Sequence, residues 1–187
     1  MPCLSEADRK AILELARQAV EEAVCRNRPV LEIPRTETLE RRCGVFVTLH
    51  VAGRLHGCIG VIEGKETLGQ SIVRCAASAA LEDQRFPKMR AEELKELEIE
   101  VSLLSGLERI QPEEIEIGRH GLLVEQDYRR GLLLPQVAEE HHLSKEQFLQ
   151  ETCRKAGLRN DAWQSPATRI FGFTCEIVTE QQQQEHK

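Results

Sequence analysis

The stretch GVFVTLHVAGRLHGCIG, residues 44–60, alternates apolar and polar side chains on both sides of a short turn sequence. Such alternation is typical of β-strands that bury one face and expose the other. The glycine in the sequence VAG at the centre predicts a tight turn, so the two strands should pair as an antiparallel hairpin. This segment therefore restricts the chain to folds that contain an antiparallel sheet.

The same pattern predicts which residues of the hairpin share a face. With a three-residue loop over 51–53, His50 would lie opposite Arg54, and Leu49 would lie opposite Leu55. The aliphatic residues of both strands then fall on the core face, whereas a two-residue loop would mix the two faces. The other face would carry five polar side chains: Thr48, His50, Arg54, His56 and Cys58.

The rest of the chain predicts helices and strands that complete an α+β fold. Apolar periodicity and capping residues predict helices over 5–27, 67–83 and 144–157, and a helix that begins at Pro135. Alternation predicts long strands over 97–110 and 168–180, with shorter ones at 122–126 and 132–134. We expect a mainly antiparallel sheet with helices packed on one side, in one domain over 1–180, and a disordered polar tail at 181–187.

Composition excludes several classes of function. The net charge of −6 argues against a general nucleic-acid-binding protein, because phosphate contacts need a concentrated positive surface. No apolar run reaches the roughly 20 residues that span a bilayer, and the N-terminus lacks the pattern of a secretory signal. Seven cysteines without a CxxC pair fit the reduced thiols of a cytosolic protein. We therefore expect a cytoplasmic protein without a metal or another cofactor.

Several blocks occur in a specific order: LHGCIG, ALEDQRFP, EIEVSLLSGLE, GRHGL, GLLLPQVAEE and FLQETCRKAGL. In these blocks the chain resembles the AMMECR domain family, called AmmeMemoRadiSam system protein A in prokaryotes, from about residue 8 to 178. The resemblance implies a larger lobe around an antiparallel sheet, a smaller accessory lobe, and two partners, a Memo-like protein and a radical-SAM protein. It implies no established reaction.

The signature of that family reads LRGCIG, and this chain departs from it at one position. His56 stands where the family has arginine, while Gly57, Cys58 and Gly60 match. An arginine would be a permanent cation, whereas a histidine is charged only part of the time near neutral pH. A fixed cation for a small anionic ligand would then have to come from Arg54, two residues earlier on the same predicted face.

Cys58 is the first candidate for chemistry. Beside His56 and Arg54 it could act as a nucleophile or a redox thiol. The alternative is that a cysteine flanked by Gly57 and Gly60 only permits close packing of another segment. Cys153, on the predicted helix over 144–157, should be a buried thiol, and it could form a redox pair with Cys58 only within disulfide reach.

Two further groups of candidates follow the signature. Asp83 could orient Arg85 toward an anionic group, with Phe86 beside them, or the pair could only fix its loop. His120, between two glycines in GRHG, could serve as a general base or could bind the backbone. Cys58, His120 and either His56 or His50 would make a soft ligand set for zinc or iron, although nothing in their spacing requires a metal.

Two functions from different classes remain. The first is a binding module that docks a ligand or partner at a cleft around LHGCIG, with Arg54, Gly57, Gly60, Asp83, Arg85 and Phe86 as the contact residues. The second is an enzyme that uses Cys58, assisted by His56 and His120. An enzyme needs an exposed and activated thiol, whereas a docking module needs an exposed apolar patch around the motif.

Overall fold

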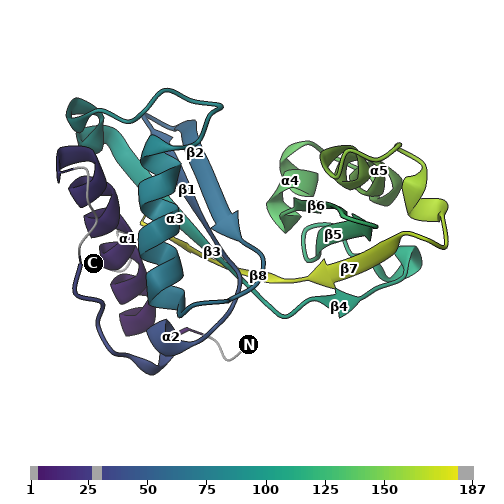
Figure 1. Ribbon diagram of the computed structural model, residues 1–187, viewed down its shortest axis with the longest axis horizontal. Coiled ribbons are helices and arrows are strands. Elements are labelled where there is room, and N and C mark those ends of the chain that lie inside the picture. The colour runs from purple at the N-terminus through teal and green to yellow at the C-terminus, as the bar shows by residue number, and fades with distance from the viewer. Residues whose placement is uncertain (1–3, 27–30, 181–187) are drawn as a thin grey trace. The chain divides into compact units, whose positions relative to one another are not determined.

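The computed structural model describes residues 4–26 and 31–180, and the chain divides into two compact units (Figure 1). The larger unit comprises Met1–Leu104 and Glu176–Lys187, and the smaller unit comprises Ser105–Cys175. The tail expected at 181–187 lies outside the described residues. Because each unit has its own sheet and its own core, we describe each one separately.

The larger unit is a four-stranded sheet with two long helices packed against one face (Figure 1). Its strands are β1 (Val45–Val51), β2 (Arg54–Val61), β3 (Leu97–Leu104) and β8 (Cys175–Thr179), and its helices are α1 (Glu6–Arg26), the short α2 (Glu37–Glu40), α3 (Leu68–Leu81) and the 3-10 turn η1 (Ala91–Glu96). The strand order is β2-β1-β3-β8, and β1 pairs antiparallel with β2 and β3. Aliphatic side chains from the helices and the sheet form a single core between the two layers.

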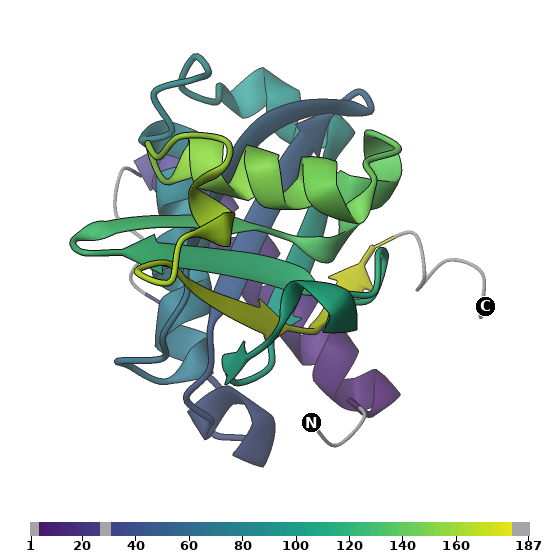
Figure 2. The same ribbon diagram turned by 90° about the vertical axis from the view of Figure 1, so that its right-hand side faces the viewer.

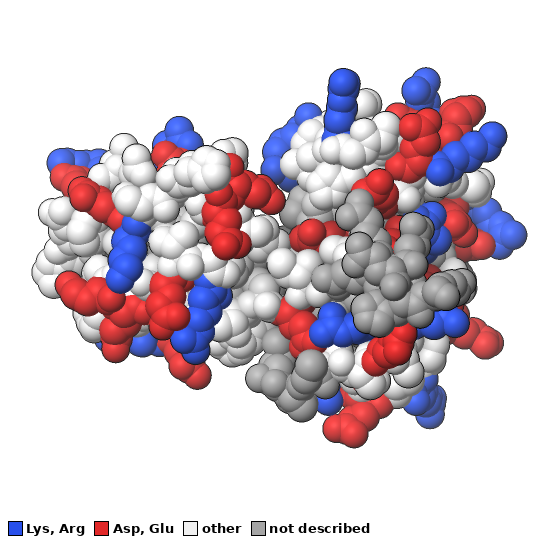
Figure 3. All heavy atoms as spheres, turned by 180° about the vertical axis from the view of Figure 1, so that it is seen from behind, with Lys and Arg blue, Asp and Glu red and all other residues white. Residues whose placement is uncertain are grey.

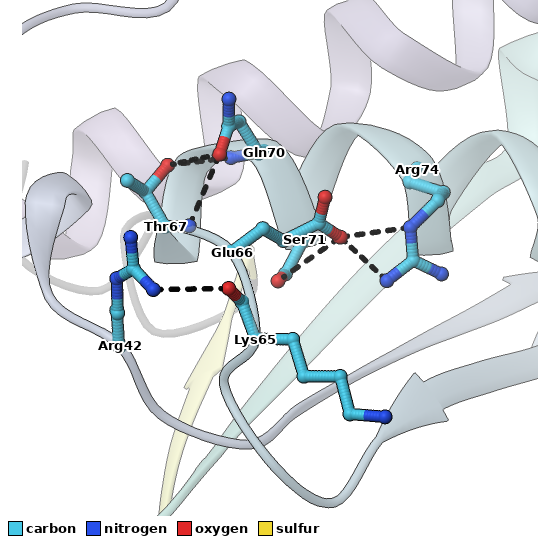
Figure 4. Close-up of polar contacts among 7 residues, drawn as sticks. All are labelled: Arg42, Lys65, Glu66, Thr67, Gln70, Ser71 and Arg74. Carbon is cyan, nitrogen blue, oxygen red and sulfur yellow. Dashed lines mark hydrogen bonds and ion pairs between the residues drawn. The ribbon is translucent and has the colours of Figure 1, made fainter.

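Both long helices begin at the predicted capping residues. The backbone N–H of Asp8 donates to Ser5 Oγ (3.1 Å), and that of Ser5 donates to Asp8 Oδ2 (3.2 Å). At α3, Gln70 N–H donates to Thr67 Oγ1 (3.3 Å) and Thr67 N–H donates to Gln70 Oε1 (3.1 Å), as Figure 4 shows. These reciprocal bonds satisfy N–H groups that a helix start leaves without partners. The helix expected over 67–83 ends at Leu81, and residue 27 of the first lies outside the described residues.

The hairpin forms, but the predicted three-residue loop is wrong. The turn consists of Ala52 and Gly53 alone, both with positive φ (50° and 71°), which matches the twist of a two-residue hairpin turn. Arg54 pairs with Val51, and a bulge then shifts the register, so that Thr48 lies opposite Cys58. The bulge supplies the extra residue that the short turn lacks.

The bulge also overturns the expected positions of two side chains. Leu55, expected in the core, is 43% exposed, whereas His56, expected on the polar face, is only 9% exposed. Beyond the bulge the predicted grouping returns, because Val47 lies opposite Ile59 on the core side. The two-residue turn places polar and apolar side chains on the same face only between the turn and the bulge. After the bulge, the extra residue restores the separation of the two faces.

The smaller unit has a second four-stranded sheet (Figure 2). It also has its own hydrophobic core. Its strands, in the order β4-β7-β5-β6, are β4 (Glu108–Arg109), β5 (Gly121–Gln126), β6 (Arg129–Leu133) and β7 (Arg169–Phe173), and its helices are η2 (Pro112–Glu114), α4 (Pro135–Glu140), α5 (Lys145–Lys155) and η3 (Ala162–Gln164). Helix α5 packs against β5 and β6, and it buries Phe148 completely. The predicted Pro135 start, the Ser144–Gln147 capping box and the Gly157 stop (φ 69°) are all confirmed.

Two long predicted strands are interrupted. The strand expected over 97–110 is divided into β3 and β4, and the strand expected over 168–180 is divided into β7 and β8. Each half belongs to a different sheet, because the chain passes between the units at these two points. Ser105 N–H donates to the Thr174 carbonyl, and Thr174 N–H donates to Ser105 Oγ (both 2.9 Å). The α+β class is confirmed, with two antiparallel sheets in place of one.

Candidate functional site

The candidate site lies at the outer edge of the larger sheet, where Cys58 occupies the middle of β2. Among the strands of the described residues, β2 pairs with β1 alone. On the other side, Cys58 N–H donates to Asp83 Oδ2 (2.9 Å), and the Cys58 carbonyl accepts from Arg85 Nη2 (3.2 Å). The two side chains therefore bind one residue of the edge strand as a neighbouring strand would. The sequence placed these residues near one another but did not predict this backbone contact.

Asp83 and Arg85 form a bidentate ion pair at the end of α3. Arg85 Nε donates to Asp83 Oδ1 (2.9 Å) and Nη2 donates to Oδ2 (2.7 Å), while the Arg85 backbone N–H also donates to Oδ1 (3.2 Å). The hydrogen bonds from Arg85, assisted by Cys58 N–H and opposed by burial, lower the pKa of Asp83 to about 2. The Asp83 side chain is 5% exposed and that of Arg85 is 58% exposed. Asp83 thus anchors a guanidinium that faces solvent.

The thiol of Cys58 is half-buried and has a hydroxyl beside it. Thr48 Oγ1, directly opposite on β1, lies 3.2 Å from Cys58 Sγ. The flanking glycines have a packing explanation, since a Cβ on Gly57 would overlap the carbonyl oxygen of Ala79, and one on Gly60 would overlap a phenylalanine ring of β1. The ligand-binding role of the two glycines stays a prediction.

His56 and Phe86 complete the group. Their rings are stacked with centroids 6.4 Å apart, and the guanidinium carbon of Arg85 lies 5.3 Å from the centroid of Phe86. His56 Nε2 is buried, and no residue in the described part of the chain accepts from it or donates to it. His56 also contributes to the lowered pKa of Glu93, which is caused first by the backbone hydrogen bond from Arg90.

Direct contacts join five of the predicted site residues in the larger unit. Cys58, His56, Asp83, Arg85 and Phe86 form one continuous set of contacts. Arg54 lies at the exposed start of β2 opposite Val51. His120 belongs to the smaller unit, where its Nδ1 accepts from the backbone N–H of Glu116 (3.1 Å).

The structure gives little support to Cys153 as a redox partner of Cys58 or to a zinc or iron site. Cys153 is fully buried in the core of the smaller unit, and this burial raises the pKa of its thiol. Among residues 4–26 and 31–180, no group of three His, Cys, Asp or Glu side chains could hold a metal ion.

On the face drawn in Figure 3, Lys and Arg side chains are interspersed with Asp and Glu.

Comparisons with known proteins agree with this α+β architecture. The AMMECR1 family model matches residues 13–178. The chain is 43% identical over 183 residues to a protein of Thermococcus gammatolerans (91% of this chain, 89% of that protein) and 40% identical over 186 residues to one of Methanothermobacter thermautotrophicus (95% and 96%). The crystal structure of the uncharacterized protein PH0010 from Pyrococcus horikoshii superimposes with a TM-score of 0.84 at 38% identity, covering 89% of this chain and 88% of that one.

This protein belongs to the AMMECR1 family. The expected membership is thus confirmed over most of the chain, with relatives in archaea. Within the described ranges, none of the helices has the length and apolar character needed to cross a membrane.

Proposed function

We propose that this protein is a cytoplasmic binding module whose contact surface is formed by Arg85, Phe86 and the neighbouring part of β2 around Cys58. One observation carries the proposal: the guanidinium of Arg85 is fixed by Asp83 and the Cys58 carbonyl, yet its side chain remains 58% exposed. A cation that is already oriented loses little side-chain entropy when it binds a carboxylate or phosphate. The natural contact would therefore be an anionic group of a ligand or a partner protein.

Exposed apolar surface around the motif supports docking of a protein. Leu55 is 43% exposed within the signature itself, and Phe86 is half-buried next to Arg85. Arginine and aromatic side chains at the centre of an interface contribute much of its binding energy. We propose the Memo-like and radical-SAM proteins implied by the family resemblance as the partners.

Asp83 and the buried Nε2 of His56 support binding more than catalysis. Asp83 uses both carboxylate oxygens to hold Arg85 and Cys58, and its lowered pKa of about 2 keeps it ionised at neutral pH. His56 has its Nε2 buried, away from solvent. A general base needs an accessible lone pair within reach of the proton that it removes.

The binding proposal is tested with the two partners from the genome that encodes this chain. Calorimetry should show a complex with at least one of them, and Arg85→Gln should weaken it about 10- to 100-fold, the usual effect of removing a hydrogen bond to a charged group. Arg85→Lys should give an intermediate affinity, because lysine keeps the charge and loses the bidentate geometry.

Arg74→Gln is the matched control for that measurement. Arg74 on α3 is also ion-paired, to Glu66 (2.5 Å), and its side chain is 51% exposed (Figure 4). Its loss should leave the affinity unchanged. Equal affinities of the wild type and a folded Arg85→Gln variant would contradict the proposal, as would the absence of binding to both partners.

A second candidate function, a cysteine-dependent enzyme, rests on the hydroxyl of Thr48 at 3.2 Å from Cys58 Sγ. An activated thiolate should react with iodoacetamide at neutral pH faster than Cys25, which is exposed and provides an internal reference. Peptide mass spectrometry resolves the rate at each cysteine. A Cys58 rate above that of Cys25 would favour the enzyme, and a slower rate would favour the binding module.

A further inference from the structure

The smaller unit contains a hollow that the site around Cys58 does not use. It lies between the β5–β6 hairpin and the segment that follows α5, and its volume is about 390 Å³. This volume falls in the range of small-molecule sites, roughly 300–1,000 Å³. The lining residues are Gln126, Arg129, Leu158, Arg159, Asp161, Ala162 and Ser165.

Arg129 gives this hollow a fixed positive charge. Its Nη1 donates to the Gly157 carbonyl (2.8 Å), and its guanidinium carbon lies 5.9 Å from the ring centroid of Tyr128. No carboxylate of the described residues forms an ion pair with it, whereas Arg159 is paired to Asp161 (2.7 Å). The two arginines and one aspartate of the lining therefore carry a net charge of about +1, a favourable setting for an anion.

Neutral donors and apolar atoms line the remainder of the hollow. The Thr168 hydroxyl donates its proton to the Ala162 carbonyl (2.6 Å), and the side-chain amide of Gln126 lies 3.2 Å from the same hydroxyl. The Gln126 NH₂ group therefore keeps at least one N–H to donate into the hollow. Ser165 Oγ accepts from Ala167 N–H (3.3 Å) and keeps its own proton to donate. Leu158 and Ala162 are half-buried and offer apolar contact.

We infer that this hollow binds a small molecule that carries a phosphate or carboxylate group on an apolar, planar body. Arg129 would bind the anionic group, with Gln126 and Ser165 as additional donors. Leu158 would contact the body, and the ring of Tyr128, which is 85% exposed beside Arg129, offers a flat surface for stacking. This inference does not depend on the function proposed for the Cys58 face.

Trp163 supplies an optical signal for the test. It is the one tryptophan of the sequence, and it lies on η3 between Ala162 and Ser165, two residues that line the hollow. Its side chain packs against the core of the smaller unit, and its Nε1 is buried without a hydrogen-bond partner among the described residues. A ligand in the hollow should therefore change its fluorescence.

The experiment titrates the full chain with phenyl phosphate, with benzoate and with neutral benzyl alcohol. We expect a saturable fluorescence change with phenyl phosphate or benzoate and none with benzyl alcohol; the stronger of the two anions identifies the chemistry. Equilibrium dialysis of the same probes provides a second reading that does not depend on tryptophan. The absence of saturable anion binding in both measurements, or equal binding of benzyl alcohol, would overturn the inference.

Two variants locate the site. Arg129→Gln should weaken binding of the preferred anion at least about 10-fold, because it removes the charge-assisted contacts. Arg154→Gln is the matched control, since Arg154 is an exposed arginine of the same unit that pairs with Glu151 on α5. Unchanged affinity in a folded Arg129→Gln variant, or equal losses in both variants, would place the anion elsewhere and contradict the inference.

Discussion

Two arginine–aspartate pairs in this protein have the same hydrogen-bond geometry and opposite surroundings. In each, the partners are two residues apart and the arginine donates through Nε and Nη2: 2.9 and 2.7 Å to Asp83, and 3.1 and 2.7 Å to Asp161. The Asp83 side chain is 5% exposed, whereas that of Asp161 is 57% exposed. Because geometry is shared, burial should decide how much each pair contributes to stability.

A further difference is what each pair holds. Asp83 also accepts from the backbone N–H of Cys58, and Arg85 donates to the carbonyl of the same residue, so the buried pair connects the end of α3 to the edge strand β2. Among the described contacts, Arg159 and Asp161 bind each other within one exposed loop. The Asp83–Arg85 pair therefore fixes the position of residues in the proposed binding surface. The Arg159–Asp161 pair supplies two of the residues that line the hollow in the smaller unit.

The largest expected effect is that of Asp83→Ala. The substitution leaves Cys58 N–H and Arg85 without their buried acceptor, and it should lower the free energy of unfolding by about 3 kcal/mol. Urea denaturation followed by circular dichroism measures this change. A loss below about 0.5 kcal/mol would show that the buried pair is no stronger than a surface pair and would remove the contrast.

The second expected effect is a pH dependence specific to Asp83. Its pKa is lowered from an ordinary value near 4 to about 2 in the folded protein, so its contribution is complete above about pH 4 and is lost as the pH falls toward 2. The wild type should therefore lose more stability than Asp83→Asn across this interval. Parallel stability–pH curves for the two proteins would contradict the assignment.

The third prediction separates the backbone of Cys58 from its side chain. Asp83 and Arg85 bind the Cys58 peptide groups, so Cys58→Ser should keep the pair intact and change the free energy of unfolding by less than about 1 kcal/mol. Thermal and urea denaturation measure the change. A loss of several kcal/mol would mean that the thiol is a packing element, and the binding surface would then have to exclude it.

The smallest expected effect is that of Asp161→Ala. Removing an exposed ion-pair partner should alter the free energy of unfolding by no more than about 0.5 kcal/mol. The same urea titration as for Asp83→Ala provides the measurement. A loss as large as that of Asp83→Ala would show that exposure does not distinguish the two pairs.

Local patterns predicted the elements of this fold better than their connections. The capping boxes at Ser5, Thr67 and Ser144 depend on residues three positions apart, so short sequence windows contain the whole interaction. The two interrupted strands depend on which sheet each half joins. The apolar alternation continues across Ser105 and Thr174, since strands of both sheets bury one face. The alternation therefore does not indicate where the chain leaves one sheet and enters the other.

Some residues of the candidate site contact one another in the structure, but the sequence did not predict how. Matching blocks indicated Cys58, Asp83 and Arg85, and the structure joins all three through direct hydrogen bonds. The bulge that buries His56 and exposes Leu55 could not be read from alternation, since it depends on the two-residue turn and on pairing with β1. The functional roles of the site residues remain predictions.

The most direct test of the proposed binding surface is the alkylation rate of Cys58 in the complex with the Memo-like or radical-SAM partner. Cys58 lies within the proposed surface, and the exposed Cys25 lies on α1. Mass spectrometry can therefore measure the labelling of both cysteines in one sample. A partner bound at Arg85 and Phe86 should slow labelling of Cys58 at least about 10-fold relative to Cys25. Unchanged labelling of Cys58 in a fully formed complex would contradict the account.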